Sequence, residues 1–229
     1  MAAVPRRISA LALLLAVALA GCGGSDKKAA TAPAAATSTV AAKPAPAGCR
    51  TVKAPAPKGE QSLKAATTPV PAGSTVVLQT SCGTIEIRLA TARSPKTDAA
   101  FAGLVKRGFI DGLTFHRIVP GFVIQGGDPA GDGQGGPGYT VVEKPSSTLR
   151  YTVGTVAMAK TGSDPPGASG SQFFIVTGPQ AASLPPDYAL LGRVTKGLAA
   201  AKAIEKVPAD DQGAPSTPVV IERATLRTG

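Results

Sequence analysis

The chain changes character at residue 74, and this change decides where a hydrophobic core can form. Residues 23–71 consist mainly of Ala, Pro, Gly, Ser, Thr and Lys, without apolar periodicity. Such a segment cannot bury enough apolar surface to offset the entropy lost on ordering. We therefore predict a flexible, partly polyproline-like tether over residues 22–73 and one folded domain over residues 74–229.

Short alternating segments dominate the folded part. Residues 74–90 contain two predicted strands, and the second, TIEIRL, alternates apolar and polar side chains. Six more strands are predicted from the segments LTFHRIV, GFVIQG, TVGTVAMA, SQFFIVT, YALLGRV and STPVVIERATL. Helices are predicted over 94–108, where Ser94 suits the N-cap, and over 197–207. This pattern predicts a mainly β fold, a closed antiparallel barrel capped by two helices.

The N-terminus has the three-part pattern of an export signal. Two arginines precede an apolar run at residues 10–20, and small residues then lead to the sequence LAGC at 19–22. The run is too short to cross a bilayer as a stable helix, so we predict a cleaved signal peptide over 1–21. LAGC resembles a bacterial lipobox, which implies lipid acylation of Cys22 and anchoring on the extracytoplasmic side of the bacterial cell membrane. An ordinary signal peptide with an unrelated cysteine is the alternative.

Cys49 and Cys82 are a possible disulfide pair in an oxidising compartment, with two unpaired thiols as the alternative. Two cysteines without histidines at ligand spacing cannot complete a zinc tetrahedron, so no metal is expected.

The net charge of +10 is unevenly distributed. Residues 23–73 carry seven basic and two acidic side chains, whereas residues 74–229 carry fifteen and twelve. The basic excess therefore lies in the tether, which argues against a nucleic-acid-binding domain and leaves a weak attraction to anionic lipid.

Several sequence blocks carry a resemblance to a known family. FHRIVPGFVIQGGDP at 115–129, GTVAMAK at 154–160 and GSQFFIVT at 170–177 resemble signature blocks of the cyclophilins, which are peptidyl-prolyl cis–trans isomerases. GDGQGGPGY and LPPDYALLGRV are similar to the bacterial branch. The resemblance covers about residues 74–228. It implies an eight-stranded antiparallel barrel with a helix over each open end, prolyl isomerase activity and no cofactor.

The chemistry of this reaction explains which residue types a site needs. Amide resonance creates a rotation barrier of roughly 18–20 kcal/mol, and X-Pro bonds have two accessible isomers. In the twisted amide the prolyl nitrogen regains its lone pair, so a guanidinium donor aimed at it stabilises the transition state selectively. The resemblance assigns this catalytic role to Arg117, with Phe122 and Gln125 completing the catalytic set.

The resemblance also implies an apolar wall around the substrate proline. Phe122, Val123, Phe174 and Leu184 match this wall. Tyr188 stands where many members have histidine, and its hydroxyl can still donate a hydrogen bond. Val123 replaces the usual methionine, which makes the pocket less adaptable.

Polar substrate contacts are implied as well. Gln125 matches the glutamine that binds substrate backbone and helps to position the arginine, and Gln172 matches a second substrate-side glutamine. Ala159 and Lys160 match the strand whose backbone pairs with the peptide, with Lys160 in place of the usual asparagine. Ser183 falls near the family's tryptophan position, so we expect weak cyclosporin binding.

Two other patterns are misleading. His116 is the only histidine, but a serine hydrolase needs a nucleophile and an orienting acid, and GASGS is not a GxSxG elbow. We expect His116 to be a packed, hydrogen-bonded structural residue. GDGQGG at 131–136 fits GxGxxG, but Pro137 and a strand-like run follow instead of a helix, so we predict a loop beside the substrate groove. The spacing around Asp128 does not complete a calcium loop either.

The predicted function is a monomeric prolyl isomerase that assists folding of exported or envelope proteins by acting on their proline-containing segments. The alternative is a non-catalytic proline-peptide binding or chaperone module at the cell surface. Such a module would not need Arg117, whereas Val123 and Lys160 leave it open. A histidine-dependent hydrolase is the third and least favoured hypothesis.

Overall fold

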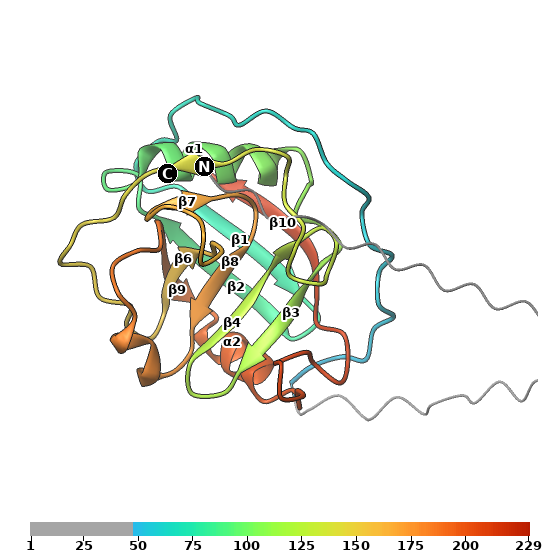
Figure 1. The fold of residues 1–229 in the computed structure, drawn as a ribbon. Coiled ribbons are helices and arrows are strands. Elements are labelled where there is room, and N and C mark those ends of the chain that lie inside the picture. The colour runs from blue at the N-terminus through green and yellow to red at the C-terminus, as the bar shows by residue number, and fades with distance from the viewer. Residues whose placement is uncertain (1–47) are drawn as a thin grey trace, which may run out of the picture. The chain divides into compact units, whose positions relative to one another are not determined.

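The structure is a computed structural model that describes residues 48–229. The predicted signal peptide, Cys22 and the first part of the tether lie outside the described residues. Within residues 48–229 the chain forms a closed β-barrel with a helix at each end (Figure 1). No helix in this part of the chain is long and apolar enough to cross a bilayer.

Eight antiparallel strands close the barrel in the spatial order β1-β10-β3-β4-β8-β6-β9-β2. Their bounds are β1 Thr75–Thr80, β2 Gly83–Leu89, β3 Leu113–Val119, β4 Val123–Asp128, β6 Thr155–Met158, β8 Phe173–Val176, β9 Leu190–Lys196 and β10 Val220–Arg227. A separate two-stranded sheet joins β5 (Val141–Val142) to β7 (Ala168–Ser169). The predicted eight-stranded antiparallel barrel is confirmed, and the two short strands of the second sheet are additions to it.

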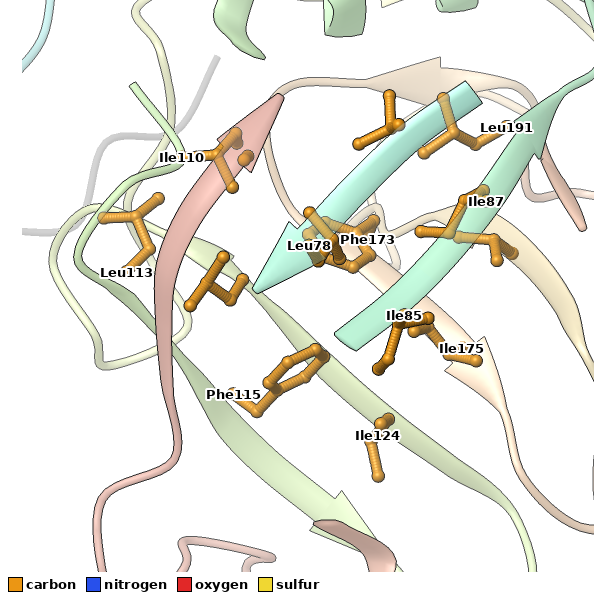
Figure 2. Packing of buried hydrophobic residues seen from close by; sticks show 14 of the residues in the cluster. Leu78, Ile85, Ile87, Ile110, Leu113, Phe115, Ile124, Phe173, Ile175 and Leu191 are labelled. Carbon is orange, nitrogen blue, oxygen red and sulfur yellow. The ribbon is translucent and has the colours of Figure 1, made fainter. Parts of the chain in front are cut away.

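The inside of the barrel is filled with side chains. Alternate strand residues point inward, as the alternation in TIEIRL predicted for Ile85 and Ile87. Figure 2 shows Ile85, Ile124 and Phe173, from three different strands, pointing into the space that the strands enclose. The rings of Phe101 and Phe173 meet edge to face, with their centroids 5.5 Å apart. Because the interior is packed, a ligand has to bind on the outer surface.

Two helices cover the barrel ends. Helix α1 (Pro95–Lys106) lies over one end and α2 (Leu198–Glu205) over the other (Figure 1). Both add buried side chains to the main core, among them Leu104 from α1 and Ile204 from α2. A short 3-10 helix, η1 (Pro179–Ser183), follows β8.

The start of α1 is capped differently from the sequence-based expectation. Ser94 occupies the N-cap position, but its side chain makes no capping hydrogen bond. Instead the Glu143 carboxylate accepts hydrogen bonds from the main-chain N–H groups of Lys96 and Thr97, at 3.2 and 2.8 Å. A carboxylate at a helix N-terminus also interacts favourably with the helix dipole. This partner is distant in sequence, so local pattern could not reveal it.

Residues 48–73, the described part of the predicted tether, contact the barrel. A disulfide joins Cys49 to Cys82, at the β1–β2 turn. Leu63 and Val70 pack against the main hydrophobic core. Composition predicted no burial here because the segment is poor in large apolar residues. The few that it has are held at the barrel by the disulfide and by main-chain hydrogen bonds, which composition does not record.

Asp98, in the first turn of α1, is a buried carboxyl group that makes the free energy of unfolding depend on pH. It is fully buried, and neither of its oxygens has a hydrogen-bond partner among residues 48–229. Burial, reinforced by the nearby Glu143 carboxylate, raises the pKa of Asp98 from 3.8 to about 8. The folded protein therefore keeps a proton that the unfolded chain releases near pH 4.

We expect Asp98→Asn to make the free energy of unfolding less dependent on pH. In the wild type, stability should fall as pH rises from about 4 to about 8, by at most about 1.4 kcal/mol per pH unit, because the unfolded chain loses the Asp98 proton in this range while the folded protein keeps it. The variant should match the wild type near pH 4 and exceed it at pH 8, as measured by urea unfolding. Asp211→Asn, at an exposed acid, is the control. Parallel pH profiles for wild type and Asp98→Asn would contradict this prediction.

Candidate active site

A β-bulge at His116 turns the side chain of Arg117 to the outside of the barrel. In the pairing of β3 with β4, Phe115 faces Gly126 and Arg117 faces Gln125, so His116 is an extra residue without a partner. Phe115 is fully buried in the core, and strict alternation would also point Arg117 inward. The inserted residue shifts the alternation by one, and Arg117 is half-buried on the outer face.

Strand register places Arg117 at the start of a row that crosses the outer face. Gln125 on β4 pairs with Arg117 on β3 and with Phe174 on β8, and Phe174 pairs in turn with Ala157 on β6. Side chains of directly paired residues lie on the same face of a sheet. The row therefore joins a cation, an amide and an aromatic ring across four neighbouring strands.

The apolar residues of the predicted site come together in a second hydrophobic cluster outside the barrel. Val123 and Phe174 are nearly buried, at 3% and 5% exposure, and form its floor. Phe122, Leu184 and Tyr188 pack against this cluster and are only half-buried, so they form its rim. The predicted apolar wall is thus assembled from β4, β8 and the segment after η1.

Beside this cluster lies a polar groove of about 730 Å³. The Gln125 side-chain amide donates a hydrogen bond to the side-chain oxygen of Gln172 at 2.9 Å. Gln172 donates in turn to the main-chain oxygens of Gly133 and Gly135, both at 2.9 Å. The loop at 131–136 therefore borders the groove, as predicted, and the two glutamines hold it in place.

Ala159 and Lys160 follow β6 and line the same groove. The Ala159 N–H already donates to the Gln172 main-chain oxygen at 2.9 Å. The Lys160 ammonium donates to the main-chain oxygens of Thr161 and Asp164 and lies 5.7 Å from the centre of the Tyr188 ring. The Lys160 ammonium is therefore held by contacts within the protein.

Arg117 borders a different hollow from the polar groove. This hollow, of about 770 Å³, is lined by residues of the β3–β4 turn, α2 and the loop at 208–213. The implied role of Gln125 in positioning Arg117 has no hydrogen bond to support it in the described residues, because the Gln125 amide bonds to Gln172. The two side chains are adjacent through strand register alone.

His116 is packed, but the prediction that it is hydrogen-bonded is wrong. Both ring nitrogens are buried, and neither has a partner among residues 48–229. Burial lowers the pKa of His116, and the neighbouring Asp128 opposes this effect. A neutral ring suits the site because it brings no charge into the interior, and its place in the bulge puts both nitrogens where no described donor or acceptor reaches them.

Tyr151 is a supporting residue that the sequence did not reveal. It is fully buried. Its hydroxyl donates a hydrogen bond to the main-chain oxygen of Tyr188 at 2.7 Å and accepts one from the main-chain N–H of Tyr188 at 2.9 Å. The rings of Tyr151, Phe174 and Tyr188 pack against one another, with centroids 5.4 to 6.1 Å apart. No local motif marks Tyr151, because its hydrogen-bond partner Tyr188 lies 37 residues away in the sequence.

We expect Tyr151→Phe to destabilise the protein by about 1–3 kcal/mol, because it leaves two main-chain groups of Tyr188 without their partner. Chemical denaturation of both proteins measures this difference. Tyr139→Phe is the matched control, since no hydrogen bond from the Tyr139 hydroxyl occurs within residues 48–229. Equal effects of the two substitutions would show that the Tyr151 hydroxyl adds nothing.

Comparison with known proteins agrees with this geometry. The family model described as "Cyclophilin type peptidyl-prolyl cis-trans isomerase/CLD" matches residues 75–226. Peptidyl-prolyl cis-trans isomerase B of Bacillus subtilis is 47% identical over 119 residues, which cover 52% of this chain and 80% of that protein. Peptidyl-prolyl cis-trans isomerase A of Mycobacterium tuberculosis is 37% identical over 173 residues, covering 68% and 93%. The crystal structure of a Cryptosporidium parvum cyclophilin type peptidyl-prolyl cis-trans isomerase aligns with a TM-score of 0.61 and 29% identity, over 68% of this chain and 99% of that one. A barrel of this topology, these site residues and these relatives together show that the chain belongs to the cyclophilin-type peptidyl-prolyl cis–trans isomerase family.

Proposed function

We propose that this prolyl isomerase acts on exported or envelope proteins, and that Arg117 is its catalytic donor. The observation that carries the proposal is the row formed by Arg117, Gln125 and Phe174 on the outer face of the barrel. This row brings a permanent cation and a hydrogen-bonding amide next to an apolar cluster, and isomerisation of a proline peptide bond requires these three features.

In the proposed reaction the substrate proline ring lies against the rim formed by Phe122, Leu184 and Tyr188. The apolar rim removes the ring from water, while Gln125 and Gln172 offer polar partners to the flanking peptide backbone. As the amide twists, its nitrogen becomes an acceptor, and the Arg117 guanidinium donates to it. The bond order of the amide falls and recovers, and no bond is broken, so no nucleophile takes part.

Features of the structure count against the histidine-dependent hydrolase. Both ring nitrogens of His116 are buried, burial lowers its pKa, and no acid within residues 48–229, the nearby Asp128 included, makes a hydrogen bond with the ring. The hydroxyl of Ser171, which is buried, already donates to the Gly127 oxygen at 2.7 Å. The non-catalytic binding module keeps the same groove and differs only in whether Arg117 changes the rate.

We expect Arg117→Ala to lower kcat/KM for a proline peptide by roughly 10²–10³-fold, as removal of one transition-state donor does in other enzymes. The KM should change far less, because the donor acts mainly on the twisted amide. A protease-free isomerisation assay, with peptide binding measured in parallel, checks both values.

Arg223→Ala is the matched control for this experiment, since Arg223 is exposed on β10, away from the row. It should retain wild-type kcat/KM. An undiminished rate in Arg117→Ala would remove the proposed catalytic role. Peptide binding without any acceleration by the wild type would favour the non-catalytic module.

The proposed location outside the cytoplasm is supported by two independent features. The N-terminal sequence has the pattern of a lipoprotein export signal. The Cys49–Cys82 disulfide is of a kind that persists mainly in oxidising compartments. An acyl-anchored protein would lie close to proteins that emerge at the membrane.

Mass spectrometry of the N-terminal peptide from the cell-made protein tests the anchoring. We expect the mature chain to begin at Cys22 and to carry acyl chains, because LAGC places this cysteine directly after the cleavage position. Cys22→Ser should abolish the acyl mass and release the protein from membranes. An unmodified N-terminus would instead support an ordinary signal peptide.

A further inference from the structure

A segment outside the family match forms part of the substrate groove. We call residues 49–70 the strap; the family model begins only at residue 75. The strap runs as an extended chain along one side of the barrel and over α1, seen in Figure 1 as the cyan trace. Residues 58–61 of the strap line the same polar groove as Gln125, Gln172 and Lys160.

The strap is fixed on the approach to the groove. The Cys49–Cys82 disulfide ties its start to the β1–β2 turn, and Arg50 pairs with Glu222 on β10. The Lys58 ammonium donates to the Phe109 oxygen at 2.6 Å and lies 5.5 Å from the centre of the Phe109 ring. The main-chain N–H of Lys58 donates to the Pro129 oxygen at 2.8 Å.

The strap is also fixed where it leaves the groove, and the barrel surface is shaped to receive it. The Leu63 N–H donates to the Pro137 oxygen at 2.9 Å. A side chain at Gly138 would collide with the main chain of Gln61, and one at Gly103 would collide with Ala66. Anchors on both sides of residues 58–61 make this stretch a wall of the groove.

The charges that line the groove single out Glu60. Of the four charged residues, Lys58 and Lys160 donate to main-chain oxygens. Asp164 accepts from the Thr161 N–H and hydroxyl at 2.8 and 2.7 Å. The Glu60 carboxylate is exposed and makes neither an ion pair nor a hydrogen bond with any residue in 48–229. Glu60 is therefore the charged side chain of this groove whose position no hydrogen bond within residues 48–229 fixes, so its carboxylate is available to pair directly with a bound peptide.

We propose that the strap is a specificity element of the isomerase, in which Glu60 selects peptides with a lysine or arginine close to the proline. The inference rests on the proposed action on proline peptides and adds a substrate class to it. An exposed ion pair is worth little, so the expected preference is about two- to fivefold. Because the pair is solvent-exposed, added salt should weaken this preference.

The test uses the full-length protein and proline peptides in which one alanine, within three residues of the proline, is replaced by lysine or glutamate. For at least one of these peptide positions, the wild type should have a kcat/KM about two to five times higher with the lysine peptide than with the glutamate peptide. Glu60→Gln should bring this lysine-to-glutamate ratio near one, and Glu60→Lys should bring it below one. For each variant, the rate with the all-alanine peptide is measured as the reference.

Thr68→Lys is the matched control, because it adds the same unit of charge as Glu60→Gln at an exposed strap position outside the groove. It should keep the wild-type ratio. Peptide dissociation constants are measured alongside, so that charge selection is judged even without turnover. The inference is overturned if Glu60→Lys leaves the lysine-to-glutamate ratio unchanged, both in kcat/KM and in peptide affinity. Failure of the wild type to accelerate any peptide overturns the catalytic proposal instead.

Discussion

The filled interior of the closed barrel is the constraint on which the rest of this structure depends. Aromatic and branched side chains from the strands and both helices occupy the space inside, as the edge-to-face contact of Phe101 with Phe173 illustrates. Interiors of this kind pack at the density of organic crystals, so they leave no room for a peptide. The barrel therefore serves as a rigid support, and the residues that we propose to meet the substrate lie on its outer face.

The regular alternation of inward and outward side chains is interrupted at the site. The extra residue at His116 breaks the alternation of β3, so that Phe115 remains in the core while Arg117 points outward. On the other side of the site, the buried Tyr151 hydroxyl holds the main chain of Tyr188 through two hydrogen bonds. His116 occupies this bulge position, and neither nitrogen of its ring has a hydrogen-bond partner within residues 48–229.

The strap extends the family's barrel with a segment that lacks regular secondary structure. Its contacts are few, but each has a long-range partner: a disulfide to Cys82, a cation at Phe109 and main-chain hydrogen bonds to Pro129 and Pro137. The strap crosses the rim of the polar groove and brings the charge of Glu60 there. The strap thereby adds a groove wall that lies outside the part of the chain matched by the family model.

The sequence alone determined the barrel architecture, because alternation in segments such as TIEIRL records locally which residues face inward. Arg117 and Gln125 were singled out by the resemblance of their sequence block, and their place on the outer face follows from the bulge at His116 and from strand register. Other features depend on residues that are distant in sequence. The tertiary structure decided that Glu143 caps α1, that the strap docks on the barrel and that His116 has no hydrogen-bond partner within residues 48–229. The physical reason is that a local pattern records which side chains can be buried or charged, whereas only the folded chain decides which distant group stands within 3 Å of them.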